Sequence, residues 1–358
     1  MDSAAVDLTW LNGALRASLP TDHSVTGFTA TPIGTGQVGE NVRFELEWDT
    51  ARTELPASVV GKFPSSSPLS RQTAVQLDTY TKEIGFYRDV AHRVEVTVPD
   101  VHHLEWDPAS HEFVLLMADV RPATVGNQLA GGSLEQAQLA VDEAVGLHAP
   151  LWSRTDELRA LDWLDVDPRA RAGDMAALVR MLAPGFADRY RPRLGDDVTA
   201  VASALADRYE TWSQAVAHWA DDRAGWCLVH GDFRLDNMLF GATPDVAPLT
   251  IVDWQTVSIG IGPADIAYHV GAGLDPAVRG RHEHDLVERY GEGLRRHGVI
   301  VDDATLWDGY VLGSATGYLM AVIASQVVER TERGDEMFAV MAERHAEQIE
   351  TVGLLDRL

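Results

Sequence analysis

Apolar and polar side chains alternate along much of the N-terminal third of the chain. The alternation is clearest over residues 42–48, where every second side chain is apolar. This two-residue period is typical of a strand with one buried face. Three more short apolar runs, at 57–63, 98–104 and 112–117, are also typical of strands. We therefore expect the region from about 26 to 117 to be rich in β-structure.

Helical periodicity precedes this region and interrupts it once. Residues 7–19 form an amphipathic pattern that stops at Pro20. Inside the strand-rich region we expect a single helix, because four apolar side chains recur at steps of three and four: Leu77, Tyr80, Ile84 and Tyr87. The N-terminal region should thus combine a sheet with one internal helix.

The rest of the chain is dominated by helical patterns. A capping box at 133–136 predicts a helix that runs towards His148. Long helical patterns follow at 197–220 and 277–357. The strand-rich part therefore precedes a helix-rich part, and the two join near 118–130.

Size and charge narrow the classes of function. A chain of 358 residues suits two lobes that share one active site. The net charge of −25, from 54 acidic and 29 basic side chains, repels phosphate backbones and anionic lipid headgroups. We therefore expect no nucleic-acid and no membrane partner. The charge is explained either by solubility or by an acidic cleft that attracts a cationic substrate.

The sequence shows no sign of export. Cys227 is the only cysteine, which excludes an internal disulfide. No basic segment followed by an apolar run marks the start as a signal peptide. The apolar stretch 318–328 is too short and too polar to span a bilayer. We expect a cytoplasmic protein.

A glycine-rich segment separates two strand-like patterns. Gly34, Gly36 and Gly39 form the pattern G-x-G-x-x-G. In a dinucleotide-binding fold this pattern opens a helix, whereas here the following residues alternate like a strand. Strand, glycine loop and strand is the arrangement that covers ATP phosphates in kinases. The three glycines are therefore candidate nucleotide-binding residues, and a plain hairpin turn is the alternative.

A lysine stands at an unusual place in an apolar strand pattern. Lys62 ends such a run, although lysine is rarely buried unless it is paired. Glu83, in the expected internal helix, can fix its ammonium group so that it reaches the ATP α- and β-phosphates. Lys82 is adjacent to Glu83, and we expect Glu83 to face inward because only a carboxylate can pair with Lys62. The alternative is a solvated edge-strand lysine with an unrelated surface glutamate.

The most informative stretch has two apolar triplets around a polar centre, which indicates two short strands that present a loop. The loop holds His230, Asp232 and Asn237, and a later apolar strand pattern ends in Asp253. Phosphoryl transfer needs a carboxylate to accept the proton of the attacking hydroxyl group, and hard oxygen ligands for magnesium. These side chains supply both. Asp236 is a competing candidate for the base, and we interpret it as a loop residue.

This stretch resembles the catalytic motif of the aminoglycoside phosphotransferase and choline kinase families, close to the ecdysteroid-kinase-like and acyl-CoA-dehydrogenase-associated branches. The residues that carry the resemblance run from His230 to Asn237 as His-Gly-Asp-Phe-Arg-Leu-Asp-Asn. The resemblance implies that Asp232 is the catalytic base and that Asn237 and Asp253 bind magnesium. It further implies that Asp265, with His230, supports the catalytic loop.

The same resemblance implies an α+β, bilobal protein-kinase-like fold. Residues 1–117 would form an N-terminal ATP-covering lobe with a small β-sheet, 118–130 a hinge or linker, and 131–358 a larger helical catalytic and substrate lobe. The hinge that grips adenine is expected near Met117, Ala118 and Asp119. Ala118 stands where a glutamate is common in the family.

The implied function is an ATP- and Mg²⁺-dependent kinase that phosphorylates a hydroxyl group of a small molecule, either a neutral or a cationic one. The alternatives are a protein kinase and a nucleotide-binding pseudokinase or scaffold without turnover. Only 12 positions separate Asp253 from Asp265, with an expected tight turn at 260–263, which leaves no room for a long activation loop. We recognise no substrate signature after residue 275, so the resemblance implies the chemistry and leaves the acceptor and the choice of ATP or GTP open.

Overall fold

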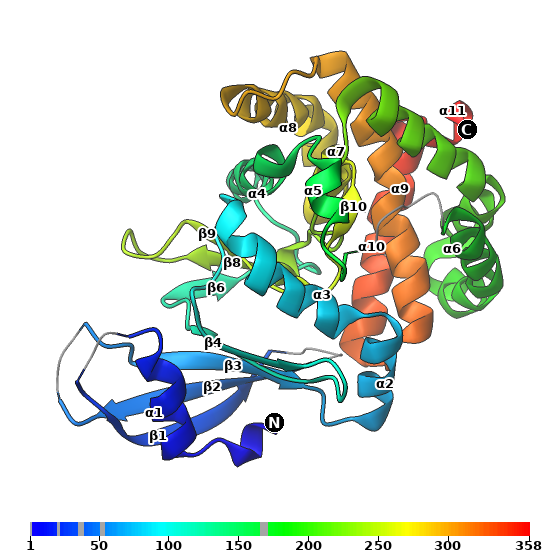
Figure 1. Cartoon of the computed structure of the whole chain (residues 1–358). Coiled ribbons are helices and arrows are strands. Elements are labelled where there is room, and N and C mark those ends of the chain that lie inside the picture. Colours follow the sequence, from blue (N-terminus) through cyan, green and yellow to red (C-terminus); the bar gives the residue numbers. More distant parts are fainter. Residues whose placement is uncertain (1, 20–21, 35–38, 51–53, 165–170) are drawn as a thin grey trace.

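The computed structural model describes residues 2–19, 22–34, 39–50, 54–164 and 171–358. It shows a mixed α+β fold in which an N-terminal antiparallel sheet adjoins a larger helical part (Figure 1). The α+β class expected from the sequence is confirmed, and so is the order of a strand-rich part followed by a helix-rich part.

Five antiparallel strands form the N-terminal sheet in the order β1-β2-β3-β5-β4. Their bounds are Val25–Ile33 for β1, Gly39–Trp48 for β2, Ser58–Pro64 for β3, Val101–Asp107 for β4 and Glu112–Ala118 for β5. Helix α1 (Leu8–Arg16) covers one face, where its Leu11 and Leu15 pack with Phe44 and Phe63 of the sheet. Burial of these alternate side chains explains the two-residue period of the sequence.

The opposite face of the sheet is covered by two short helices, where the sequence predicted one. Helix α2 (Pro68–Gln76) ends before Leu77, and α3 (Thr79–Gly85) begins after Asp78, which has a left-handed backbone with φ of 54°. The helical period of the sequence runs across this break, so periodicity alone could not show it. Leu77 is 50 % exposed, whereas Tyr80 and Ile84 are buried, so only the later side chains form the expected buried face.

The helical part is built around α9 (Asp303–Val327), which contacts α7 (Gly262–Gly273), α6 (Ala172–Trp219) and α10 (Glu332–Thr351). By length and composition α9 alone, among helices of the described ranges, could cross a membrane, yet 61 % of its most apolar window is buried inside the protein. Such burial is what the core helix of a compact domain shows. The remaining helices are α4 (Leu134–His148), α5 (Thr155–Arg159), α8 (Pro276–Arg296) and α11 (Leu354–Arg357).

Two details of the helical part refine the sequence analysis. The capping box before α4 is confirmed, because Ser133 and Gln136 exchange side-chain and backbone hydrogen bonds. The tight turn expected at 260–263 is wrong. Gly260 ends strand β10 (Ser258–Gly260), and Pro263 lies in the first turn of α7. Proline lacks a backbone N–H, and an N–H at this place would have no acceptor within the helix.

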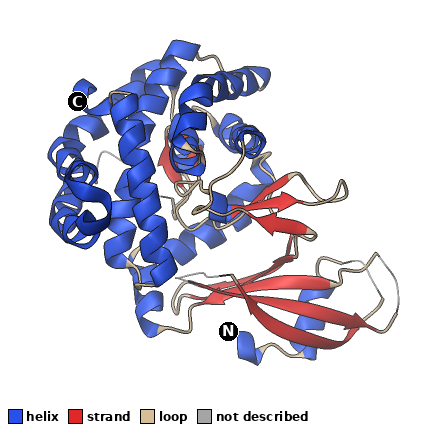
Figure 2. Cartoon of the chain, turned by 180° about the vertical axis from the view of Figure 1, so that it is seen from behind, coloured by secondary structure: helices blue, strands red, loops and turns tan. Residues whose placement is uncertain are grey.

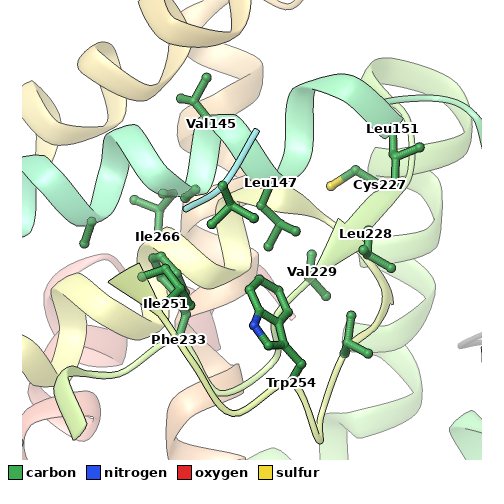
Figure 3. Packing of buried hydrophobic residues seen from close by; sticks show 14 of the residues in the cluster. Val145, Leu147, Leu151, Cys227, Leu228, Val229, Phe233, Ile251, Trp254 and Ile266 are labelled. Carbon is green, nitrogen blue, oxygen red and sulfur yellow. The ribbon is translucent and has the colours of Figure 1, made fainter. Parts of the chain in front are cut away.

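Two small sheets follow the N-terminal sheet: the three-stranded one lies beside it, and the two-stranded one lies among the helices (Figure 2). Strand β7 (Cys227–Val229) pairs with β10, while β8 (Met238–Gly241) lies between β6 (Ala123–Val125) and β9 (Leu249–Ile251). The two apolar triplets of the sequence are therefore strands, as predicted, and each pairs with a different partner. Figure 3 shows the apolar core beneath them, which includes Phe233, Trp254 and Ile266. This core fixes the loops that the strands present.

Candidate active site

The loop between β7 and β8 is fixed from below by one buried carboxylate. Asp265, in the first turn of α7, accepts hydrogen bonds from the backbone N–H groups of His230 at 2.7 Å and Gly231 at 3.0 Å. His148 at the end of α4 lies 3.2 Å from the same carboxylate and 2.8 Å from the Tyr290 hydroxyl group. We call the Asp265 carboxylate the brace of this loop, because it connects the loop to helices α4 and α7.

Gly231 is required by the turn that follows the brace. Its φ is 79°, a left-handed conformation that favours glycine. A Cβ atom there would lie 2.7 Å from the backbone oxygen of Thr256. The Thr256 hydroxyl group in turn donates to the carbonyl oxygen of His230 at 2.8 Å. The backbone is therefore pinned on both sides directly before Asp232.

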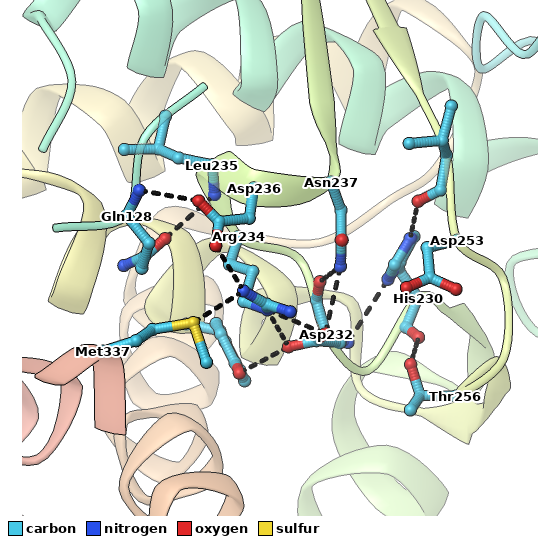
Figure 4. A network of polar contacts seen from close by, with 12 residues as sticks. Gln128, His230, Asp232, Arg234, Leu235, Asp236, Asn237, Asp253, Thr256 and Met337 are labelled. Carbon is cyan, nitrogen blue, oxygen red and sulfur yellow. Dashed lines mark hydrogen bonds and ion pairs between the residues drawn. The ribbon is translucent and has the colours of Figure 1, made fainter. Parts of the chain in front are cut away.

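Asp232 is enclosed by donors (Figure 4). Its Oδ1 accepts from the Tyr268 hydroxyl group at 2.6 Å, and its Oδ2 accepts from the Asn237 amide at 3.0 Å. The Arg234 Nε lies 3.0 and 2.9 Å from the two oxygens. Burial alone would raise the pKa of Asp232, but Arg234 and then Tyr268 outweigh it and hold that pKa below its usual value. The carboxylate is therefore ionised and oriented.

Asn237 and Asp253 are brought together by the pairing of β8 with β9. The carbonyl oxygen of Asn237 accepts from the N–H of Val252, and His230 Nε2 donates to the carbonyl oxygen of Val252 at 3.2 Å. His230 Nδ1 accepts from the Asp232 N–H at 3.3 Å, which fixes this tautomer. One histidine thus joins the strand that carries Asp253 to the loop that carries Asp232.

The side chains of Asn237 and Asp253 fit a magnesium ion. The Asn237 amide nitrogen donates to Asp232 twice, so its side-chain oxygen faces the other way as a hard ligand. Asp253 is 36 % exposed and has a left-handed backbone with φ of 70°, a strained conformation typical of functional sites. No group of three or more His, Cys, Asp or Glu in the described ranges could hold a metal by itself. Mg²⁺ commonly takes one or two carboxylates and completes its shell with phosphates and water.

Lys62 and Glu83 form the buried pair expected from the sequence. Lys62 Nζ lies 2.7 Å from Glu83 Oε1 and 3.0 Å from Asp253 Oδ1. Burial alone would lower the pKa of Lys62, but Asp253 and Glu83 outweigh it and raise that pKa. Burial raises the pKa of Glu83, against the effect of Lys62. Gln255 completes the group by donating to Glu83 Oε2 at 3.3 Å.

The glycine loop lies close to this lysine. Gly34 follows β1 with φ of 74°, and Gly39 opens β2, so the two described glycines of the pattern lie next to the ends of two paired strands. A Cβ atom at Gly39 would lie 3.3 Å from Cε of Lys62, so a larger side chain there would crowd the lysine. The predicted Gly36 lies outside the described residues.

The segment predicted as the hinge ends strand β5. Met117 is paired with Val60 of β3, and the Ala118 N–H donates to the carbonyl oxygen of Asp100. The Asp119 carboxylate is nearly buried and is held by three side chains at 2.6 to 2.8 Å: Arg43, Ser58 and Arg121. The Asp119 carboxylate and the Ala118 N–H are therefore both committed to contacts within the protein.

Two residues that contact Asp232 were missed by the sequence analysis, namely Arg234 and Tyr268. Arg234 lies two residues after the base, and a pair of opposite charges at that spacing is a weak signal. Tyr268 lies one helical turn after Asp265, so a helix that presents the brace also presents this tyrosine. The sequence analysis gave His148 no role beyond the end of a predicted helix, and the structure shows it bound to Asp265.

Comparisons with known proteins agree with this arrangement. The profile of the phosphotransferase enzyme family, APH, matches residues 32–299. No curated protein sequence matches the chain. Several solved structures share its fold, and three of them follow. The GDP complex of wild-type aminoglycoside 2'-phosphotransferase-IIIa is 15 % identical with a TM-score of 0.53, and the alignment covers 96 % of this chain and 100 % of that one.

The GDP and kanamycin complex of an APH(2") enzyme is 16 % identical, with a TM-score of 0.54 and coverage of 94 % and 98 %. A Plasmodium vivax ethanolamine kinase is 8 % identical, with a TM-score of 0.53 and coverage of 89 % and 82 %. These likenesses show the fold. Since the family profile covers well over half of the sequence, the chain belongs to the phosphotransferase enzyme family.

Proposed function

We propose that this protein is an ATP- and Mg²⁺-dependent kinase that transfers the γ-phosphoryl group to a hydroxyl group of a small molecule. The observation that carries the proposal is one connected set of contacts. Lys62 binds Asp253, Asp253 follows the strand pinned by Asn237 and His230, and Asn237 binds Asp232. A base, two magnesium ligands and a phosphate-binding cation thus converge from two parts of the fold.

Each residue has a distinct role in the proposed reaction. Asp232 accepts the proton of the attacking hydroxyl group. The hydroxyl oxygen bonds to the γ-phosphorus, and the bond between that phosphorus and the leaving ADP oxygen breaks. Lys62 stabilises the α- and β-phosphates, and Glu83 keeps it in place. Asn237 and Asp253 would hold Mg²⁺, which neutralises charge on the phosphates when it is bound.

Nucleotide binding is assigned to the remaining predicted residues. The backbone of the glycine loop, at Gly34 and Gly39, would cover the phosphates, where its N–H groups can meet phosphate oxygens. The backbone at Met117, Ala118 and Asp119 would contact the base. Two GDP complexes of aminoglycoside phosphotransferase structures with the same fold support nucleotide use.

A small-molecule acceptor is supported by the segment between Asp253 and Asp265. Its 12 positions are used by the approach to β10, the strand itself and the start of α7. A protein kinase uses the equivalent stretch for an activation loop that presents a peptide. The structures in complex with kanamycin and of an ethanolamine kinase support small acceptors in proteins of this fold.

The test is transfer of label from γ-labelled ATP or GTP to a panel of sugars, amino-alcohols, amino-sugars and hydroxylated acids, beside a mixed set of proteins. We expect labelled small-molecule product that is lost in Asp232→Asn. Robust transfer to proteins with none to the panel would contradict the proposal. Nucleotide binding without transfer to any acceptor would favour a pseudokinase.

A further inference from the structure

The proposed base has no free position for an acceptor in this structure. A carboxylate offers about four lone-pair sites, two on each oxygen. Oδ1 of Asp232 is contacted by Tyr268 and Arg234, and Oδ2 is contacted by Asn237 and Arg234. An attacking hydroxyl group needs one of these sites. These four contacts use three hydrogen atoms, because the single Nε–H of Arg234 is shared by both oxygens and covers the sites between them. One donor must therefore move before a hydroxyl group can take a site there.

Arg234 is the donor that can move. Tyr268 lies in α7 and is fully buried, and Asn237 is 5 % exposed and also donates to the Asp232 carbonyl oxygen. The Arg234 side chain is long and 17 % exposed, on the side of the site that opens to solvent at Arg333, which is 43 % exposed. The acceptor would therefore enter past these two arginines and take the place of Arg234 on Asp232.

A second arginine, Arg333, shares a carboxylate with Arg234. Arg234 Nη1 and Arg333 Nη2 lie 3.0 and 2.9 Å from the same oxygen of Asp236. The N–H of Gln128 donates to the other oxygen of Asp236, and the Gln128 carbonyl oxygen accepts from Arg344. Once a hydroxyl group replaces Arg234 on Asp232, two guanidinium groups share one carboxylate. The charges of the two arginines and the two aspartates still balance, but the guanidinium group released from Asp232 then lies beside that of Arg333, where the acceptor enters.

We propose that the acceptor is a hydroxyl compound with an anionic group, a carboxylate or a phosphate, which Arg234 and Arg333 bind. Guanidinium groups present paired N–H donors that match either anion, and such charge-assisted pairs are strong. The inference rests on the proposed kinase function and adds the acceptor class. It departs from the cationic acceptor that the net charge of −25 suggested, because the charges beside the base, and not those of the whole surface, select the substrate.

Matched probes test the sign of the acceptor charge. Hydroxybutyrate, butanediol and aminobutanol, each with its primary hydroxyl group at one end of a four-carbon chain, place a carboxylate, a hydroxyl or an ammonium group at a similar reach. Glycerol phosphate beside glycerol supplies the phosphate arm. Binding of each probe to the full chain, saturated with Mg²⁺ and a non-hydrolysable ATP analogue, is measured by titration calorimetry. The proteins are wild type, Arg333→Gln and Arg296→Gln, where Arg296 is an exposed control on α8.

We expect wild type and Arg296→Gln to bind an anionic probe more tightly than its neutral or ammonium counterpart. Arg333→Gln should weaken the anionic probe about tenfold or more, because one charge-assisted contact is lost, and should leave the neutral probes unchanged. The carboxylate and phosphate arms decide which anion is preferred. Tighter binding of the ammonium probe, no binding of either anion, or equal anion binding in Arg333→Gln would overturn the proposal.

Parallel transfer assays separate this inference from the proposed function. Transfer of labelled phosphate to aminobutanol alone would keep the kinase and overturn the anionic acceptor. Anion-selective binding that depends on Arg333, with no transfer to any compound, would support the anion site and contradict the kinase. Transfer to the anionic probes, reduced in Arg333→Gln, would support both.

Discussion

Lys62 and Asp253 are 191 residues apart in sequence, and their charged atoms lie 3.0 Å apart. Lys62 belongs to β3 of the N-terminal sheet, and Asp253 follows β9 beside the catalytic loop. The ion pair thus joins the two parts of the fold at the place where we propose that nucleotide phosphates bind. Its energetic and catalytic contributions can be separated by mutation.

Replacement of the lysine should affect nucleotide use more than folding. We expect Lys62→Ala to lower kcat/KM for ATP strongly, because the α- and β-phosphates lose their cation, and Glu83→Ala to do so more mildly. Lys62→Arg should not restore activity, since a planar guanidinium group does not replace a compact ammonium group. Steady-state kinetics with varied ATP measure both effects. A fully active Lys62→Arg enzyme with normal KM would refute the proposed pairing.

Asp232→Asn keeps the shape of the side chain and removes its ability to accept a proton. We expect kcat to fall by about 10²–10⁴, the usual range for loss of a general base. Affinity for ATP, measured by titration, should change little, because the base faces the acceptor. Asp245→Asn, on an exposed loop, is the matched control. Near wild-type kcat in Asp232→Asn would mean that another residue, such as Asp236, is the base.

Asn237 and Asp253 are proposed to act on one ion, so their mutations should not add. We expect Asp253→Ala to abolish turnover and to weaken Mg²⁺-dependent binding of ATP, and Asn237→Ala to act in the same direction. The double variant should be about as active as the weaker single variant, because residues that act as a unit are non-additive. Losses that multiply in full would indicate two independent roles.

Substitution of Asp265 should lower both the stability and the activity of the protein. Asp265→Asn can accept on only one oxygen, whereas two backbone N–H groups of the buried loop need acceptors. An unsatisfied buried donor costs about 1–3 kcal/mol, so we expect a lower free energy of unfolding in denaturant titrations. We also expect a lower kcat, since Asp232 follows directly. A stable variant with normal kcat would show that the brace is dispensable.

Local patterns were enough to predict most strands and the loop between β7 and β8 that carries Asp232, whereas the short strands β6 and β10 were missed. The period of two in β2 and the apolar triplets around Asp232 reflect burial along one element, which sequence shows directly. The break at Asp78 was missed, because a left-handed residue between two helices need not disturb the helical period. Boundaries of this kind depend on backbone conformation at single residues.

Contacts between distant elements could not be predicted from the sequence. Tyr268 reaches Asp232 because the brace sets the rotation of α7, and Arg333 reaches Asp236 because α10 packs against α7. The spacing of Tyr268 from Asp265 shows only that both side chains lie on one face of a helix, and it does not identify Asp232 as the partner. The commitment of the Asp119 carboxylate to Arg43 likewise depends on the pairing of distant strands. The candidate residues could thus be predicted from their residue types and local pattern, whereas the side chains that contact them could be identified only from the structure.

Two buried histidines predict how stability depends on pH. His269 and His345 are fully buried, and burial lowers the pKa of each from 6.5 to about 4, with Arg279 and Arg344 lowering that of His345 further. His345 Nδ1–H donates to Gln348 at 3.0 Å, which opposes the shift. Between pH 6.5 and 4 the unfolded chain binds protons at both positions and the folded chain does not. Unfolding therefore takes up protons, and stability falls as pH decreases through this window.

Each histidine should add about 1.4 kcal/mol per pH unit to the slope of the free energy of unfolding against pH. We expect the urea-derived free energy of unfolding to fall more steeply between pH 6.5 and 4 in wild type than in His269→Gln/His345→Gln. Carboxylates contribute equally to both proteins, so the difference in slope isolates the histidines. His284→Gln, at an exposed position on α8, should keep the wild-type slope. Parallel slopes in wild type and the double variant would contradict this prediction, because they would show that the two histidines take up protons in the folded state as readily as in the unfolded state.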